Sequence, residues 1–107
     1  MTTQNLDVFQ VIADPSRRQI LVMLSKESKT INALAQNFEM SRPAVSKHVK
    51  ILYTAGFISI TDVGRERYCT LKQDGFIELQ DFINYFDKFW TGKLTTLKGI
   101  LNVKSKR

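Results

Sequence analysis

The side chains in this 107-residue chain that are best suited to chemistry are basic, and they gather in one short segment. Between residues 41 and 50 every charged side chain is cationic: Arg42, Lys47 and Lys50, with His48 among them. Such side chains bind polyanions through charge and through hydrogen bonds to phosphates and base edges. Nothing near them resembles a nucleophile–base pair or a phosphate loop, so the segment favours nucleic-acid binding and no enzymatic activity is expected.

The overall composition agrees with a polyanionic partner. The net charge is +6, and the apolar fraction of 43% predicts one folded domain over residues 1–107. The single cysteine, Cys69, excludes an internal disulfide and fits a reducing compartment. The N-terminal residues show no signal peptide, and no stretch is long and apolar enough to cross a bilayer, so we expect a cytoplasmic protein without a membrane partner.

Two short helices joined by a tight turn are predicted over residues 30–55 and must position the basic cluster. Thr30 and Ser41 are suited to cap the two helices, and Glu39 lies in the turn, where a glycine is frequent. The second helix repeats Val45, Val49 and Leu52 at spacings of a buried helical face. Its outward side is then formed by Arg42, Pro43, Ser46, Lys47 and Lys50, which is the pattern of a helix-turn-helix.

Two further helices are predicted before this pair. The first spans residues 5–13, where Leu6, Phe9, Ile12 and Ala13 recur at helical spacing. The second runs from Pro15 to Leu24 after an Asp14 cap; Ile20, Leu21 and Leu24 are expected inside, and Arg17 and Arg18 outside. Residues 25–29 are expected to be a polar connection.

A β-hairpin is predicted after Gly56, which has the character of a glycine just beyond a helix end. Over residues 57–71 the apolar residues alternate with polar ones, and the turn contains Gly64. The tip of the hairpin carries Arg65 and Arg67. The expected fold is therefore mainly α with a small β-hairpin, in the order α-α-α-α-β-β-α, a dimeric winged helix-turn-helix with its wing over residues 57–71.

A long last helix is predicted over residues 74–101, although Gly92 leaves its continuity open. Its apolar face is too wide for a small domain to cover alone, and we expect it to form a dimer seam. The alternatives are a wide core helix, or a small-molecule pocket lined by Tyr85 or Trp90. The predicted seam includes Phe82, Phe86, Phe89, Trp90, Leu94 and Leu97.

Four stretches together resemble the arsenic-repressor (ArsR/SmtB) family of bacterial winged-helix repressors: DPSRRQIL, SRPAVSKHVKIL, AGFI and GRERYCTL. The resemblance implies a homodimer in which the first helix, with Leu6 and Phe9, joins the last helix in the interface. It also implies that Asp14, Pro15 and Arg18 serve capping and ion pairing. Residues matching the family's DNA-reading segment are Ser41, Arg42, Pro43, Ser46, Lys47 and His48, and those matching its wing are Arg65 and Arg67.

Many members of that family sense metals, but the ligands are missing from the corresponding positions here. The segment from Phe38 to Ser41 has no cysteine, and the last helix has Asp81 and Asp87 but no histidine. Cys69 is expected to be a small buried apolar residue rather than a redox sensor. The chain thus resembles the metal-independent branch of the family, whose members repress their own or neighbouring genes, and neither a metal nor a cofactor is expected.

The expected function is a sequence-specific transcriptional repressor that binds an inverted repeat in double-stranded DNA as a homodimer. One alternative is a regulator that responds to a small molecule or to thiol oxidation, although the effector is unknown. Another alternative is a winged-helix module that binds proteins and no DNA.

Overall fold

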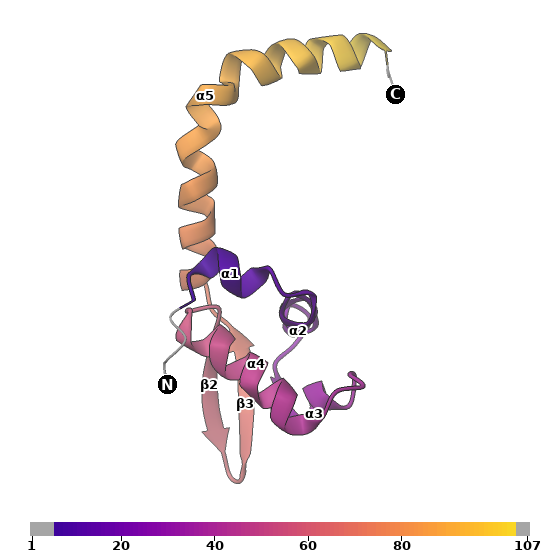
Figure 1. Cartoon of the computed structure of the whole chain (residues 1–107), viewed down its shortest axis with the longest axis vertical. Helices are drawn as coiled ribbons and strands as arrows, with labels where there is room; N and C mark the ends of the chain where they lie inside the picture. The colour runs from indigo at the N-terminus through magenta and orange to yellow at the C-terminus, as the bar shows by residue number, and fades with distance from the viewer. Residues whose placement is uncertain (1–5, 105–107) are drawn as a thin grey trace. The chain divides into compact units, whose positions relative to one another are not determined.

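The computed structural model describes the backbone of residues 6–104 and the side-chain surroundings as far as residue 90. The chain forms two compact units that divide after Ile77. Along the chain (Figure 1) the elements are α1 (Val8–Ile12), α2 (Pro15–Leu24), β1 (Lys29–Thr30), α3 (Ile31–Ala35), α4 (Arg42–Thr54), β2 (Ile58–Val63), β3 (Glu66–Leu71) and α5 (Asp74–Lys104). This mainly helical arrangement with a β-hairpin confirms the predicted winged helix-turn-helix.

The core of the first unit lies where the inner side of α4 meets the neighbouring elements. Val45, Val49 and Leu52 are almost completely buried, as their spacing predicted. Helices α2 and α3 pack against α4, and strand β2 packs against it as well. The predicted inward residues of α2 are also buried, namely Ile20, Leu21 and Leu24. Because α4 is held from several sides, its outer face has a defined orientation.

The prediction that Arg17 points outward is wrong. Only 8% of this residue is exposed, and it is the one charged residue that is buried among the described residues. Its Nε donates to the Val11 carbonyl oxygen at 2.6 Å, and its Nη2 donates to the Gln10 carbonyl oxygen at 3.3 Å. These carbonyls belong to the end of α1: the Gln10 carbonyl also accepts from the Ala13 N–H at 3.3 Å, and Arg17 supplies a side-chain donor to the Val11 carbonyl. Burial is therefore offset by hydrogen bonds that no sequence spacing reveals.

Arg18, predicted to act in ion pairing, is exposed and donates instead to the Ile12 carbonyl oxygen at 2.7 Å. Asp14 caps α2 as predicted, since its carboxylate accepts from the backbone N–H groups of Ser16 and Arg17. Partial burial alone would raise the pKa of Asp14, but these two hydrogen bonds, with the nearby charge of Arg17, bring it below its ordinary value.

Both ends of α4 follow from local sequence. Ser41 caps the start through its hydroxyl oxygen, which accepts from the Ala44 N–H, and a proline stands in the first turn. At the other end Gly56 has a φ of 85°, in the left-handed region. The Gly56 N–H donates to the Tyr53 carbonyl and the Phe57 N–H to the Leu52 carbonyl, which together form a Schellman motif.

We expect Gly56→Ala to destabilise the protein by about 1–2 kcal/mol, because an L-residue is strained in the left-handed region. The added Cβ would also lie 3.2 Å from the Cβ of Asp74. Urea unfolding measures the change. Gly64→Ala is the matched control: Gly64 also has a positive φ, of 64°, but a Cβ there meets no atom within 4 Å. A larger loss at Gly64 than at Gly56 would contradict this interpretation.

The sheet has three strands rather than the two that were predicted, in the order β1-β3-β2 with antiparallel pairing. The additional strand β1 pairs Lys29 with Cys69 and Thr30 with Tyr68. Two polar residues carry no alternating pattern, so the prediction of an unstructured connection at residues 25–29 missed the start of this strand. Tertiary pairing with β3 alone creates it.

The hairpin itself forms where it was predicted. Ile60 lies opposite Cys69, and Val63 lies opposite Glu66 across a two-residue loop. Gly64 is the first loop residue, the position at which a type II′ turn requires a positive φ. In the other turn, Glu39 replaces a frequent glycine without strain, since no non-glycine residue in the described part of the chain has a positive φ. The tip of the β2–β3 hairpin projects from the first unit (Figure 1).

Helix α1 is shorter than predicted and buries a different side. It begins after an Asp7 capping box, and its buried residues are Val8 and Val11, whereas Phe9 is 40% exposed and Leu6 is half-buried. The two predicted interface residues therefore keep accessible surface.

Helix α5 is continuous through Gly92. In its first turn Phe76 packs edge-on against the buried Phe57, with ring centroids 4.9 Å apart. Farther along, large apolar side chains remain exposed, among them Phe82 (51%), Phe89 (58%) and Trp90 (43%). The side chains of Leu94 and Leu97, also predicted to lie in the dimer seam, are outside the described residues.

Candidate nucleic-acid interface

The outer side of α4 presents most of the residues predicted to contact DNA. Ser41, Arg42 and Pro43 are exposed at the start of the helix, and Lys47 and Lys50 are exposed farther along. Ser46 and His48 are half-buried. From residue 41 to residue 55 this surface carries no acidic side chain. The segment therefore offers an uninterrupted basic surface on a rigid element.

Arg42 is oriented by a residue that the sequence did not single out. Its Nε donates to the side-chain oxygen of Asn32 in α3, and both residues are exposed. This hydrogen bond leaves the two terminal nitrogens of the guanidinium group available. A fork of two N–H donors is the group that pairs with the O6 and N7 atoms of guanine.

His48 turns toward α2 instead of lying fully on the outer side. Its Nδ1 is 3.1 Å from Nη1 of the buried Arg17. The ring is thus held at the edge of the basic surface, in contact with the guanidinium group that closes the end of α1. His48 therefore has a packing contact as well as a place in the predicted DNA-reading segment.

The wing places its two arginines differently. Arg65 is exposed in the hairpin loop. Arg67 lies on β3, where its Nε donates to the Asp62 carboxylate at 3.1 Å. Both side chains of this pair are more than 60% exposed, so the ion pair contributes little to stability, on the order of 0–1 kcal/mol. Arg67 can therefore exchange Asp62 for another anion at small cost.

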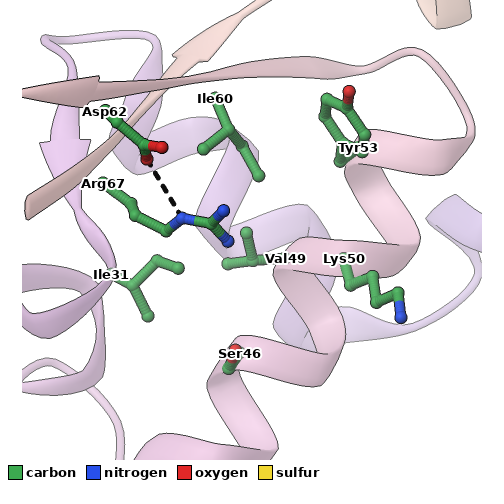
Figure 2. Close-up of a pocket in the computed structure, with 8 residues that line it drawn as sticks. All are labelled: Ile31, Ser46, Val49, Lys50, Tyr53, Ile60, Asp62 and Arg67. Atoms are coloured by element: carbon green, nitrogen blue, oxygen red, sulfur yellow. Dashed lines mark hydrogen bonds and ion pairs between the residues drawn. The ribbon is translucent and has the colours of Figure 1, made fainter.

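A cleft of about 350 Å³ separates the wing from α4 (Figure 2). Figure 2 shows the Arg67 guanidinium reaching from β3 toward Val49 of α4, while the Lys50 ammonium points away from Arg67. The cleft brings together residues from α3, α4, β2 and β3: Ile31, Ser46, Val49, Lys50, Tyr53, Ile60, Asp62 and Arg67. The lining combines apolar, polar and charged side chains, and it is shared by the wing and α4.

Cys69 is completely buried in β3, as predicted for a small apolar residue. Burial raises the pKa of its thiol, although the charge of Arg67 acts in the opposite direction. A raised pKa disfavours the thiolate, which is the reactive form of cysteine.

Within the part of the chain that the structure describes, no three His, Cys, Asp or Glu side chains gather as a metal site would require. Among the same residues, no helix combines the length and the apolar character needed to cross a membrane.

The sequence missed three residues that shape this surface: Asn32, which bonds Arg42; Arg17, which bonds His48; and Tyr53, which lines the cleft. Asn32 lies on the outer side of α3 ten residues before Arg42, so helical spacing within one element could not connect them. Tyr53 could have been found, because it follows Ser46 and Lys50 along one side of α4 at i+7 and i+3.

Comparisons with known proteins agree with this geometry. A family model described as "Bacterial regulatory protein, arsR family" matches residues 14–59. The HTH-type transcriptional regulator Rv2034 of Mycobacterium tuberculosis is 36% identical over 81% of this chain and 78% of its own length. The transcriptional repressor SdpR of Bacillus subtilis is 37% identical over 78% of this chain and 89% of its own length.

Solved structures share the fold. The crystal structure of the ArsR family transcriptional regulator RHA00566 is 32% identical, with a TM-score of 0.74 over 78% of this chain and 92% of that chain. A homodimeric winged helix-turn-helix DNA-binding domain from Mycobacterium bovis is 20% identical, with a TM-score of 0.61 over 73% and 72% of the two chains. The basic helix, the wing and these relatives lead to one assignment: the chain belongs to the ArsR family of bacterial regulatory proteins.

Proposed function

We propose that the protein is a transcriptional repressor that binds an inverted repeat in double-stranded DNA as a homodimer. The observation that carries this proposal is the outer side of α4, which is basic and free of acids while its inner side is locked into the core. In a helix-turn-helix protein such a helix lies in the major groove. SdpR of Bacillus subtilis, which is named as a transcriptional repressor, supports the repressor role.

The contacts divide into two kinds. We assign base reading to the first half of α4, through Ser41, Arg42, Pro43, Ser46 and Lys47, because the start of a recognition helix contacts base edges. We assign phosphate contacts to Lys50, Arg65 and Arg67, which lie on the basic surface or on the wing. The sequence favoured base reading for His48 as well, but its ring turns toward α2, so we assign it to a phosphate. The basic side chains also make affinity strongly salt-dependent.

The dimer is supported by the exposed aromatic side chains of α5, since apolar patches of this kind usually mark interfaces. The homodimeric domain from Mycobacterium bovis has the same fold. In a two-fold dimer the two recognition helices would stand about 34 Å apart, one turn of B-DNA. A palindromic operator follows from that symmetry.

We propose that repression needs no metal. Cys69 is buried in β3, and the other residue that a soft or borderline metal prefers, His48, contacts Arg17. Thermal unfolding and operator binding, each measured with Zn²⁺ and with EDTA, test this. Equal operator affinity under both conditions is expected, and a change of tenfold or more in either direction would contradict it.

A gel-shift titration on the DNA upstream of the protein's own coding sequence tests the repressor proposal. We expect a dimer complex whose affinity falls steeply between 50 and 200 mM salt, roughly 10³-fold or more for six or more phosphate contacts. Footprinting on the same DNA should show two protected half-sites. Absence of binding even at the lowest salt would overturn the proposal and favour a protein-interaction module.

We expect Arg42→Ala to weaken operator binding by about 1–3 kcal/mol and to relax specificity at one base pair of each half-site. The reason is that the free fork of Arg42 is assigned to a base edge. Binding of all single-base operator variants, measured by fluorescence anisotropy, checks the loss of discrimination. Lys47→Ala, at an assigned base contact, and Lys50→Ala, at an assigned phosphate contact, are measured on the same operator variants for comparison. If Arg42→Ala weakened every sequence equally, Arg42 would be a phosphate contact instead.

The cleft beside the wing favours a small-molecule-responsive regulator as the second candidate function. Its volume is in the range of ligand pockets, and it joins apolar residues to Arg67, which can exchange the exposed Asp62 for the carboxylate of a small molecule. A ligand seated between α4 and the wing would compete with DNA for Arg67. Thermal-shift measurements against a set of aromatic and aliphatic carboxylates test this candidate. A thiol sensor has less support, because Cys69 is buried with a raised pKa.

A further inference from the structure

The buried Arg17 connects helix α1 with helix α4, the helix that we propose reads DNA. Arg17 in α2 directs its Nε and Nη2 to carbonyl oxygens of Val11 and Gln10 in α1, and its Nη1 to Nδ1 of His48 in α4. Only 8% of the Arg17 surface is exposed, so these contacts are made inside the protein. The three contacts of Arg17 therefore fix the position of the guanidinium group beside the imidazole ring.

This contact determines which nitrogen of His48 carries the proton. An arginine side chain has donors and no acceptor, so at 3.1 Å the Nδ1 atom of His48 must accept the hydrogen bond. An imidazole that accepts at Nδ1 and is neutral carries its hydrogen on Nε2. A doubly protonated ring would lose this hydrogen bond and would place two cations in contact.

The other nitrogen of the ring faces solvent. Within the described part of the chain no hydrogen bond reaches Nε2 of His48, and no buried side-chain nitrogen or oxygen is left without a partner. Nε2 is therefore accessible, on the half-buried ring at the edge of the basic surface. It presents a single N–H donor in a direction that Arg17 fixes.

Asp14 is the acidic group near this pair. Its carboxylate accepts from the Ser16 and Arg17 N–H groups, and its charge acts on His48 through space without an ion pair between them. The direct hydrogen bond from Arg17 is specific for the Nε2–H form.

We propose that Arg17 is a positioning residue that holds His48 as the neutral Nε2–H tautomer, so that Nε2 donates a hydrogen bond to a phosphate oxygen of bound DNA. This rests on the proposed DNA-binding function and adds to it a residue that never touches DNA. A phosphate is the partner because His48 lies at the flank of α4, beside α2, where a helix in the major groove meets the sugar-phosphate backbone.

The first experiment uses the fact that the chain has one histidine. Long-range ¹H–¹⁵N NMR spectra of the full chain at pH 7.5 report the tautomer of His48 without ambiguity. We expect the Nε2–H form in the wild type and a mixture of tautomers in Arg17→Met. A wild-type ring in the Nδ1–H or imidazolium form would overturn the proposal.

The second experiment separates the two nitrogens by substitution. The amide of His48→Gln can place a donor near Nε2, whereas the amide of His48→Asn can accept from Arg17 but not reach the DNA. We expect His48→Asn to raise the operator Kd about tenfold and His48→Gln to raise it less than about threefold. Because a neutral ring releases no counterion, neither variant should change the salt slope, whereas Lys50→Ala, at an assigned phosphate contact, should reduce it by about 1. Equal losses for Gln and Asn would overturn the proposal.

A double-mutant comparison shows whether Arg17 acts through His48. Arg17→Met should raise the Kd about tenfold in the wild-type background and less than about twofold in His48→Asn. A tenfold effect in both backgrounds would mean that Arg17 only supports the fold. If Arg17→Met does not fold, the proposal is still tested by the tautomer of His48 in the wild type and by the operator affinities of His48→Gln and His48→Asn. A wild type that binds no DNA would overturn the proposed function as well, whereas DNA binding with the wrong tautomer overturns this proposal alone.

Discussion

Phe89→Glu should convert the protein into a monomer and reduce its affinity for an inverted repeat by about 10²-fold or more. Phe89 is 58% exposed on α5 and stacks edge-on against Trp90, with ring centroids 4.8 Å apart. If α5 forms the dimer seam, the substitution buries a carboxylate among aromatic rings, which is strongly unfavourable. Without the second subunit each recognition helix binds a half-site alone and loses the gain of simultaneous binding.

Sedimentation velocity measures the oligomeric state, and anisotropy measures binding to the whole operator and to one half-site. Gln80→Glu is the matched control, because it introduces the same charge at an exposed position on the same helix. Half-site binding should be the same for the wild type and Phe89→Glu. A Phe89→Glu variant that remains dimeric would remove α5 residues around Phe89 from the interface and would leave the DNA-binding surface unaffected.

Leu52→Ala should destabilise the protein by about 2–5 kcal/mol, because the side chain is fully buried and its removal leaves a cavity. Leu52 also carries the carbonyl that closes the Schellman motif with the Phe57 N–H at 3.0 Å, next to the equally buried Phe57 ring. The substitution keeps this backbone hydrogen bond but removes the side-chain packing at the end of α4. We therefore expect DNA affinity to fall together with stability.

Thermal unfolding by circular dichroism measures the effect, and a fall in Tm of roughly 10 °C or more is expected for a domain of this size. Tyr53→Ala, one residue farther along, removes a larger side chain that is 52% exposed, so its effect on stability should be within about 0.5 kcal/mol. Equal losses for the two variants would show that the inner face of α4 has been assigned incorrectly.

Much of the fold could be predicted from local sequence. The buried side of α4 followed from the spacing of Val45, Val49 and Leu52, since one helical period determines which residues share a face. Its ends followed from Ser41 and Gly56, because caps and left-handed positions depend on a few neighbouring residues. The hairpin over residues 57–71 followed from alternation and a glycine at the turn. These features need no information about distant parts of the chain.

The candidate site could be predicted only in part. The sequence placed Arg42, Lys47 and Lys50 on one exposed surface, but not the Asn32 side chain that orients Arg42 or the Asp62 carboxylate that holds Arg67. These partners lie on other elements, and their distances are set by how α3 and the wing pack on α4. Strand β1 has the same origin, because two polar residues become a strand only when β3 is beside them.

By itself, then, the sequence determined the basic helix α4, its buried face and the β-hairpin, because periodicity, caps and turns are local properties. The tertiary structure alone decided that Arg17 is buried and bonded to His48. A charged side chain is exposed by default, since removing it from water is unfavourable. Here two carbonyls at the end of α1 and the ring on α4 meet the guanidinium from two directions, and that convergence exists only once the three helices have packed together.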